Sequence, residues 1–432
     1  MLVLTSLRAA SSGVAAQDSS VSFEFGTPTT ILSTQDMDRY GVMFPDGTLS
    51  FLRQDSKDGE PYLLFAAGGS FGGAGMGAHL LAGTYAFAGT LDSFHPMRRG
   101  HAWPTSALTV GRLQPSPEGT DFDRDYAGGG PTYRLAQPSG GAAGDFCSRW
   151  PPAGTATTPR SGPLLQIYHG EIHLLPPKAM PGYGGSGMAV SCDGGQTFEK
   201  IGQILAPHLS RAEFLEAHVD GGLWIDGAMI EGDANGERGC VTTACPPGER
   251  FYYLIFTDHN SVDERYTGLS IARTRAEDLF SAIRQHRAPS FRKYYNPSGL
   301  PALQGDHFTE PGLGGRSTPV VLAPGQHMNT PGILYDDYLG RFVLFYQTNQ
   351  KQVELRTALN VFSWSPAEVA FQLDAASNRR VFYPSVAGRE DADPQVPGQT
   401  FYLYFLVRER TSRGFVDPQL LREWVSVTRR TH

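Results

Sequence analysis

Acidic side chains follow two apolar runs of this sequence at the point where each run ends. Glu171 comes directly after the run 162–170, and Asp258 closes the run 250–258 with two more polar residues behind it. A strand that emerges into a site ends in this way, and carboxylates placed there can transfer protons to and from a substrate. A salt-bridged strand end at Glu171 and a capped turn at Asp258 explain the two patterns equally well.

Five runs of aromatic and aliphatic residues recur along the chain, and each has the composition of a buried middle strand. The runs are PYLLFAA (61–67), GPLLQIYHG (162–170), RFYYLIFTD (250–258), RFVLFYQT (341–348) and TFYLYFLV (400–407). An extended approach strand precedes four of them, whereas that of the second unit is unclear, and strands of small and polar residues follow several. Units of three or four strands repeated five times predict an all-β fold, a five-bladed β-propeller. A β-sandwich of unrelated strands is the alternative.

The repeats predict a single propeller domain over 18–432. Residues 1–17 are expected to be a leader, either an export signal that ends at Val14-Ala15-Ala16 or a disordered segment. The Pro/Gly-rich stretch 100–160 is interpreted as a loop insertion on this scaffold, and 276–286 is the one segment expected to form a short helix.

Composition and charge exclude several classes of partner. Net charge is -7 and the basic residues are scattered, so we expect no nucleic-acid partner. No apolar run reaches the roughly 18 residues that a membrane span needs. Cys240 and Cys245 share a Gly/Pro-rich loop, where a small disulfide ring would form in an oxidising compartment, although free thiols remain the alternative. We therefore expect a secreted or periplasmic protein without structural zinc.

The arrangement of acidic starts, aromatic middle strands and Ser- or Thr-ended third strands resembles the five-bladed propeller glycosidases of glycoside hydrolase families 43, 32 and 130. The residues that carry the resemblance are Asp46 with PYLLFAA and GTLDSF, Asp226 with FYYLIFTD and IARTRAEDLF, and the YHGE stretch at 168–171. It spans roughly residues 36–407. These families place carboxylates at the inner ends of different blades, so the resemblance implies a glycosidase whose carboxylates face a funnel on the axis.

Hydrolysis of a glycosidic bond needs one carboxylic acid to protonate the leaving oxygen and one carboxylate as base or nucleophile. Glu171 is the leading candidate for the acid. Asp46, at the start of the first blade, is the leading candidate for the base or nucleophile, although Pro45-Asp46-Gly47 also has the composition of an ordinary Asp-Gly turn. Asp226 carries the same alternative. Asp36 and Asp38, two residues apart on an expected extended segment, are substitutes for Asp46, with Asp38 ranked higher.

Polar and aromatic residues near the expected funnel are candidates for substrate contacts. They are Tyr168, His169, Asp258, His327, Asn329, Arg316 and Tyr383. No cofactor is expected to be required. A structural Ca²⁺ on the axis is an option that the resemblance implies, but the chain lacks a dense run of oxygen ligands.

Residues 191–198 fit the Asp-box, a hairpin device of sialidases and other propellers, which is structural rather than catalytic. One full copy occurs, without the arginine constellation that sialidases use. The sequence thus predicts a glycoside hydrolase that cleaves an oligo- or polysaccharide. The alternatives are a carbohydrate-binding propeller without activity, and a polysaccharide lyase that uses a His and a Tyr.

Overall fold

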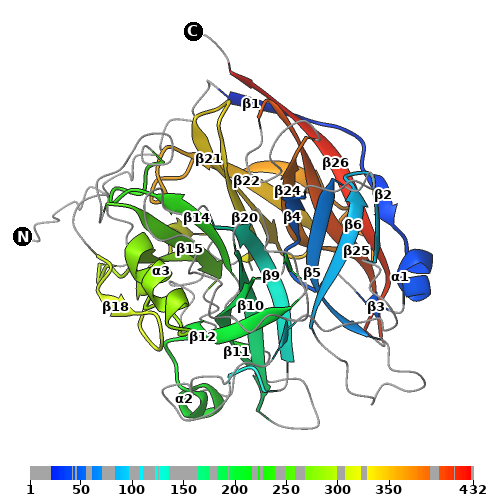
Figure 1. The fold of residues 1–432 in the computed structure, drawn as a ribbon. Coiled ribbons are helices and arrows are strands. Elements are labelled where there is room, and N and C mark those ends of the chain that lie inside the picture. The colour runs from blue at the N-terminus through cyan, green and yellow to red at the C-terminus, as the bar shows by residue number, and fades with distance from the viewer. Residues whose placement is uncertain are drawn as a thin grey trace, which may run out of the picture.

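Five separate β-sheets make up the computed structural model of the chain (Figure 1). The residues it describes are 21–40, 42–43, 46–54, 61–70, 83–96, 108–109, 122–124, 126–135, 163–174, 182–192, 194–195, 197–216, 222–223, 227–238, 249–257, 268–298, 307–322, 328–389, 398–412 and 414–429. Within these residues no helix is long and apolar enough to cross a bilayer.

Each sheet is one blade, and the blades follow the chain in order. Blade I contains β3 (Val42–Met43), β4 (Ser50–Arg53), β5 (Tyr62–Ser70), β6 (Gly83–Thr90) and β7 (Ser93–Pro96). Blade II contains β8 (Leu108–Thr109), β9 (Tyr126–Arg134), β10 (Leu164–His173), β11 (Gly182–Ser191), β12 (Phe198–Leu205) and β13 (Gly222–Leu223). Blade III contains β14 (Gly227–Gly232), β15 (Phe251–Thr257), β16 (Gly268–Arg275), β17 (Arg292–Lys293), β18 (Glu310–Pro311) and β19 (Val321–Leu322).

The last two blades complete the ring. Blade IV contains β20 (Met328–Asp336), β21 (Arg341–Thr348), β22 (Gln352–Ala358) and β23 (Glu368–Gln372). Blade V contains β24 (Arg379–Gly388), β25 (Thr400–Thr411) and β26 (Gly414–Arg429), together with β1 (Val21–Phe25) and β2 (Thr29–Leu32) from the start of the chain. Pairing of β1 with β26 joins the two ends of the described chain in one blade.

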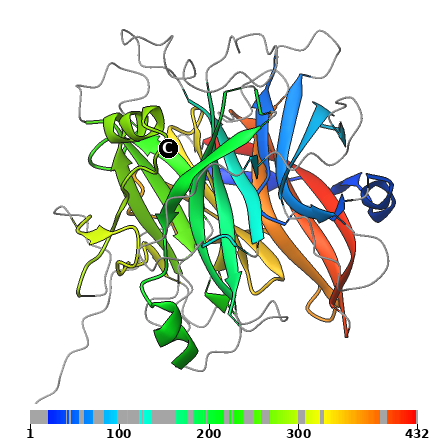
Figure 2. The ribbon, with the colours of Figure 1, turned by 60° about the horizontal axis from the view of Figure 1, so that its bottom comes forward.

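The innermost strands β4, β9, β14, β20 and β24 contact one another in a closed cycle around the axis. They lie at the centre of the molecule in Figure 1, and the other strands of each sheet spread outward. The three short helices, α1 (Thr34–Tyr40), α2 (Arg211–Glu216) and α3 (Ala276–Arg284), lie at the periphery (Figure 2). The fold is a five-bladed β-propeller, as the sequence predicts.

Apolar side chains fill the space between each pair of neighbouring blades. The five aromatic runs are the second strands β5, β10, β15, β21 and β25, whose two faces pack against both neighbouring blades. All seven residues of β15 are buried. The prediction that each run is a buried middle strand is therefore confirmed, and so is the short helix, which is α3.

The structure supplies the approach strand that the sequence leaves unclear, and it corrects the interpretation of Asp36 and Asp38. The approach strand of the second unit is β9, which begins at Tyr126. Asp36 and Asp38 do not lie on an extended segment but in α1, whose start is stabilised because Ser33 donates both its N–H and its hydroxyl to the Asp36 carboxylate. Asp38 is exposed on this helix, at the rim of the molecule.

Three of the inner strands carry an irregularity of their pairing next to a proline. The register shifts opposite Pro131 in β9, at Thr330-Pro331 in β20 and at Tyr383-Pro384 in β24. Thr330 and Tyr383 have left-handed backbones, with φ of 48° and 55°. Because proline has no N–H to donate, the ladder cannot continue there, and the bulge redirects the side chain beside it.

The Asp-box turn and one cysteine can be placed as well. Gly195 donates its N–H to the Ser191 hydroxyl at 2.8 Å, and the turn seats Phe198 edge-on against Phe65 of blade I. Cys192 in this turn is disulfide-bonded, and its partner lies outside the described residues, as do Cys240 and Cys245.

Glu423 of β26 provides a test of packing between blades IV and V. It is only 4% exposed, and burial raises its pKa from 4.5 to about 7. Below the pKa of the unfolded state the carboxyl is protonated in both states. As the pH rises toward the pKa of the folded state, the unfolded state ionises first, so folding stability is lost. We expect Glu423→Gln to raise the free energy of unfolding at about pH 8, by at most about 3 kcal/mol, and to have little effect at about pH 4.

Urea unfolding at the two pH values measures this difference. Glu277→Gln, at an exposed position of α3, is the matched control and should change neither value. A Glu423→Gln protein that is less stable than the wild type at the higher pH would contradict the assignment.

Candidate active site

Asp46 lies in the segment between β3 and β4, and its N–H donates to the Ala67 carbonyl of β5 at 2.8 Å. Tyr126 of blade II donates its hydroxyl to Oδ2 at 3.2 Å, and Tyr383 of blade V donates to Oδ1 at 3.0 Å. Nη2 of Arg408 is 3.8 Å from Oδ1. Side chains of blades II and V thus converge on one carboxylate of blade I, with donors that suit a negative charge.

Tyr126 connects Asp46 with Glu171. It is the first residue of β9 and pairs directly with Glu171 of β10. Burial raises the pKa of the Tyr126 phenol well above its usual value, and the charges of Asp46, Tyr383 and Glu171 raise it further. The phenol therefore stays protonated and acts as a donor. Its ring covers Gly128 so closely that a Cβ there would be 2.4 Å from the hydroxyl, so a side chain at position 128 would displace the Tyr126 ring.

Two imidazoles hold the Glu171 carboxylate. Nε2 of His169 is 3.0 Å from Oε1, and Nε2 of His173 is 3.3 Å from Oε2. The three residues alternate along β10 and so project from the same face of the sheet. All three side chains are partly exposed, at 15% for His169, 19% for Glu171 and 26% for His173, so a ligand can reach the carboxylate.

A buried ion pair supports β10 from its other face. Lys200 Nζ is 2.7 Å from Asp123 Oδ2, and it also lies 5.2 Å from the ring centroid of Tyr168. Burial raises the pKa of the Tyr168 phenol well above its usual value, and the Asp123 carboxylate adds to this. Tyr168 is 1% exposed and packs on Gly187, so it braces the strand instead of making the predicted contact with substrate.

The structure brings together only part of the predicted site. Asp46 accepts hydrogen bonds from Tyr383 and Tyr126, and Tyr126 pairs across the sheet with Glu171, whose carboxylate contacts His169. Arg316 does not join them: it is exposed in the turn after β18, at the outer side of blade III, with its N–H on the Glu310 carboxylate. The predicted residues outside the described part of the chain are Asp226, Asp258 and His327. Asp38 is far from the axis on α1, and Asn329 lies in β20.

Three residues of the cluster are not predicted from the sequence. Tyr126 is hidden in the Gly-rich segment whose strand is unclear, and Arg408 directly follows the fifth aromatic run. His173 has a visible signal, because it repeats the spacing of His169 and Glu171 along the same strand.

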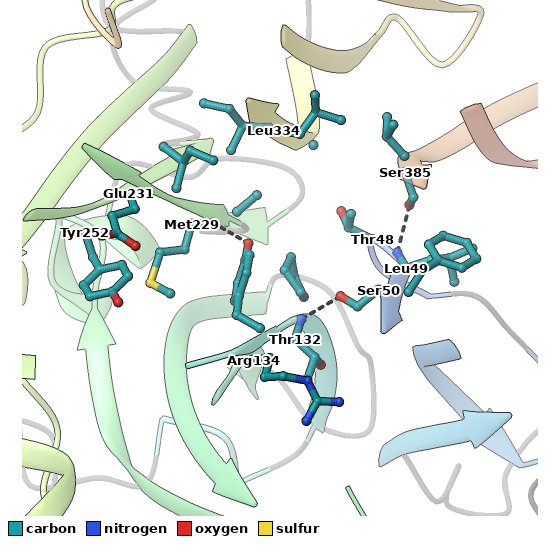
Figure 3. Close-up of a pocket in the computed structure, with 18 of the residues that line it drawn as sticks. Thr48, Leu49, Ser50, Thr132, Arg134, Met229, Glu231, Tyr252, Leu334 and Ser385 are labelled. Atoms are coloured by element: carbon teal, nitrogen blue, oxygen red, sulfur yellow. Dashed lines mark hydrogen bonds between the residues drawn. The ribbon is translucent and has the colours of Figure 1, made fainter. Parts of the chain in front are cut away.

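Further along the inner strands, the axis contains a pocket of 210 Å³ (Figure 3). Its walls come from all five blades and include Thr48, Ser50, Thr132, Met229, Leu334 and Ser385. Glu231 is the one carboxylate of its lining, and it is paired with Arg250. The pocket lining thus begins at Thr48 and Ser385, two residues along the chain from Asp46 and Tyr383.

Hydrogen bonds between blades surround this pocket. Thr132 donates its N–H to the Ser50 hydroxyl at 2.6 Å, Leu49 donates to the Ser385 hydroxyl at 2.8 Å, and Met229 donates to the Tyr133 hydroxyl at 2.5 Å (Figure 3). In the part of the chain that the structure describes, no three His, Cys, Asp or Glu side chains converge to hold a metal ion.

Neither a family model nor a curated protein matches this sequence. Solved structures that are similar include a GH43 β-1,3-galactosidase in complex with galactodeoxynojirimycin, at 12% identity, with 88% of this chain and 90% of that one covered and a TM-score of 0.42. An α-L-arabinofuranosidase from Lactobacillus brevis is 12% identical, with 90% and 94% covered and a TM-score of 0.42. A family 117 glycoside hydrolase from Zobellia galactanivorans is 9% identical, with 95% and 92% covered and a TM-score of 0.42. These values are too low to carry a function over to this chain.

The buried pair behind β10 can be tested by removing one partner. Lys200→Met leaves the Asp123 carboxylate buried without its cation, and we expect a loss of about 3–5 kcal/mol in the free energy of unfolding. The double variant Lys200→Met/Asp123→Leu should regain much of this loss, because no uncompensated charge remains. Urea unfolding of both proteins provides the measurement.

The exposed pair of Arg275 and Glu277 is the control, and Arg275→Ala should leave stability nearly unchanged. Equal stability of Lys200→Met and the wild type would show that the pair does not brace the strand.

Proposed function

We propose that this protein is a glycoside hydrolase in which Glu171 is the general acid and Asp46 is the base or nucleophile. The observation that carries the proposal is the position of Tyr126 next to two carboxylates of neighbouring blades: it donates its hydroxyl to Asp46 and pairs across the sheet with Glu171. A reaction with an oxocarbenium-like transition state uses such a pair. The partly exposed carboxyl of Glu171 can reach a leaving-group oxygen.

The surroundings of each carboxylate suggest the assignment of roles. Asp46 accepts two phenolic hydrogen bonds and lies beside a guanidinium, partners that stabilise its anion, and this anion can face the positive charge that develops on the sugar. Glu171 has imidazoles on both oxygens, and these can accept or donate as its proton leaves and returns. Tyr126 and Tyr383 orient Asp46 through their hydrogen bonds, and the raised pKa of Tyr126 keeps its phenol protonated.

The compartment and the substrate belong to the same proposal. The disulfide at Cys192 supports a secreted or periplasmic protein, because such bonds persist in oxidising compartments. A carbohydrate substrate would be bound over the funnel at the Asp46 end of the inner strands. Proton transfer by Glu171 and Asp46 does not require a calcium ion.

Substitution of either carboxylate tests the proposal. We expect Glu171→Gln and Asp46→Asn each to reduce reducing-sugar release by about 10²–10⁴-fold, since each removes one half of the proton-transfer pair. The measurement is sugar release from a panel of arabinans, fructans, mannans and bacterial glycans. Asp38→Asn, which replaces an exposed carboxylate on α1, is the matched control and should retain full activity.

Thermal denaturation of each variant establishes that the fold is intact. If the wild type releases sugar and the Glu171→Gln protein does so at the same rate, Glu171 is not the acid. No release by the wild type from any glycan would favour a sugar-binding propeller.

A polysaccharide lyase is the second candidate, because the ring centroids of Tyr126 and His169 are 6.1 Å apart and Arg408 is close by. A lyase needs a base to remove a proton next to a uronate carboxylate, and the raised pKa of Tyr126 makes its phenol unsuited to that role. We expect no ultraviolet absorbance from an unsaturated uronate when the protein is incubated with polyuronates. Appearance of that absorbance, and its loss in Tyr126→Phe, would establish the lyase instead.

A further inference from the structure

Four polar atoms without any hydrogen-bond partner gather on the first two strands of blade IV. They are Oδ1 of Asn329, Oγ1 of Thr330, and both Oε1 and Nε2 of Gln347. Asn329 of β20 and Gln347 of β21 pair directly across the sheet, so their side chains project from the same face. Gln347 is 1% exposed and Thr330 is 4% exposed. A buried polar group that forms no hydrogen bond destabilises the fold, so this group of atoms needs an explanation.

These three residues of blade IV lie beside the candidate active site. A Cβ at Gly332 of β20 would be 3.0 Å from the carbonyl oxygen of Pro384, so the bulges of β20 and β24 contact each other. In β24 the bulge presents Tyr383 to Asp46. Thr330 has the equivalent position in β20, with the same left-handed backbone before a proline. The innermost strands of blades IV and V therefore both have a left-handed residue followed by a proline. In blade IV the polar groups at this bulge form no hydrogen bonds.

The chemistry of these atoms indicates what they bind. Two amides and one hydroxyl provide both donors and acceptors, and none of them carries a charge. A hydroxyl group on a sugar ring is also both donor and acceptor, so neighbouring hydroxyls can satisfy an amide and a threonine together. A uronate or phosphate would instead require a cation, and Arg408, which lies nearby, is directed at Asp46.

We propose that Asn329, Thr330 and Gln347 form a subsite for vicinal hydroxyls of a neutral sugar ring. The subsite deepens the glycosidase proposal and rests on it, because it places the bound ring beside Asp46 and selects uncharged glycans. Asn329 is the partly exposed member and meets the ring first, and Thr330 and Gln347 lie beneath it. Binding would supply the hydrogen bonds that the free protein lacks.

Trapped water is the competing explanation. A sugar subsite and a water site predict opposite effects of substitution on the stability of the sugar-free protein. Gln347→Met and Thr330→Val keep nearly the same shape and remove the unpartnered atoms. A site that waits for a ligand should become more stable without its polar groups, so we expect a higher Tm for both variants. Structural water would lose its partners in these variants, so a lower Tm overturns the proposal.

Binding by the full chain is measured by the rise in Tm with L-arabinose, D-galactose, D-xylose or D-fructose, each added separately, and with D-glucuronate as the charged probe. We expect at least one neutral sugar to raise the Tm of the wild type, with that shift reduced by at least half in Gln347→Met. No shift with any of the four neutral sugars, or an equal shift with D-glucuronate, overturns the proposal.

Thr274→Val is the matched control, because its hydroxyl is also buried without a partner but lies in β16, opposite Tyr252. It should leave the sugar-induced shift unchanged. On a glycan that the wild type hydrolyses, KM should rise about tenfold or more in Gln347→Met and not in Thr274→Val, and an unchanged KM overturns the subsite alone. A sugar-induced shift that depends on Gln347, in a protein that hydrolyses no glycan, leaves the subsite standing and refutes the hydrolase.

Discussion

The innermost strand of each blade has one edge that faces the axis without another strand beside it, and the molecule depends on how that edge is satisfied. Backbone groups at a buried edge need partners, and a β-ladder between blades would turn the ring into a barrel. Side-chain hydroxyls are the partners instead. Those of Ser50, Ser385 and Tyr133 each accept a hydrogen bond from a backbone N–H of a neighbouring blade. At the I–II, II–III and V–I interfaces these hydrogen bonds add to the apolar packing between the blades, and the pocket lies on the axis between them.

The proline bulges extend this arrangement toward function. Where a ladder is interrupted, a side chain is freed from the regular alternation of the strand and can be aimed at the axis. In β24 the result is that Tyr383 donates to Asp46, and in β20 it is Thr330, whose hydroxyl forms no hydrogen bond, like Oδ1 of Asn329 and the Gln347 amide. The carboxylate pair therefore belongs to no single blade. Its geometry is set by the relative positions of blades I, II and V, which in turn depend on the apolar packing between them.

Much of the fold could be predicted, because burial of a middle strand on both faces leaves a continuous apolar run in the sequence. The inner strands lack such a signal: β9 is half glycine and small residues, so its start at Tyr126 is not visible. The helix of Asp38 did carry a local signal, Ser33 three residues before Asp36, but the acidic pair was interpreted as part of a strand. Gln347 lies inside an apolar run, where nothing distinguishes a buried amide that binds from one that packs. Asp46 and Glu171 could be named from their positions, but the position of Tyr126 next to both requires the three-dimensional fold.

Pairing of β1 with β26 has a consequence for how the chain acquires its structure. Val21 pairs with Arg429, so β1 can join blade V only after β26 has been synthesised. Contacts between residues so distant in sequence slow folding, since the entropy of closing the whole chain is lost before the pairing compensates for it. Until then the long edge of the final hairpin is open to other strands, including those of neighbouring nascent chains. Synthesis of β26, and not the appearance of any earlier blade, thus sets the earliest moment at which the ring can close.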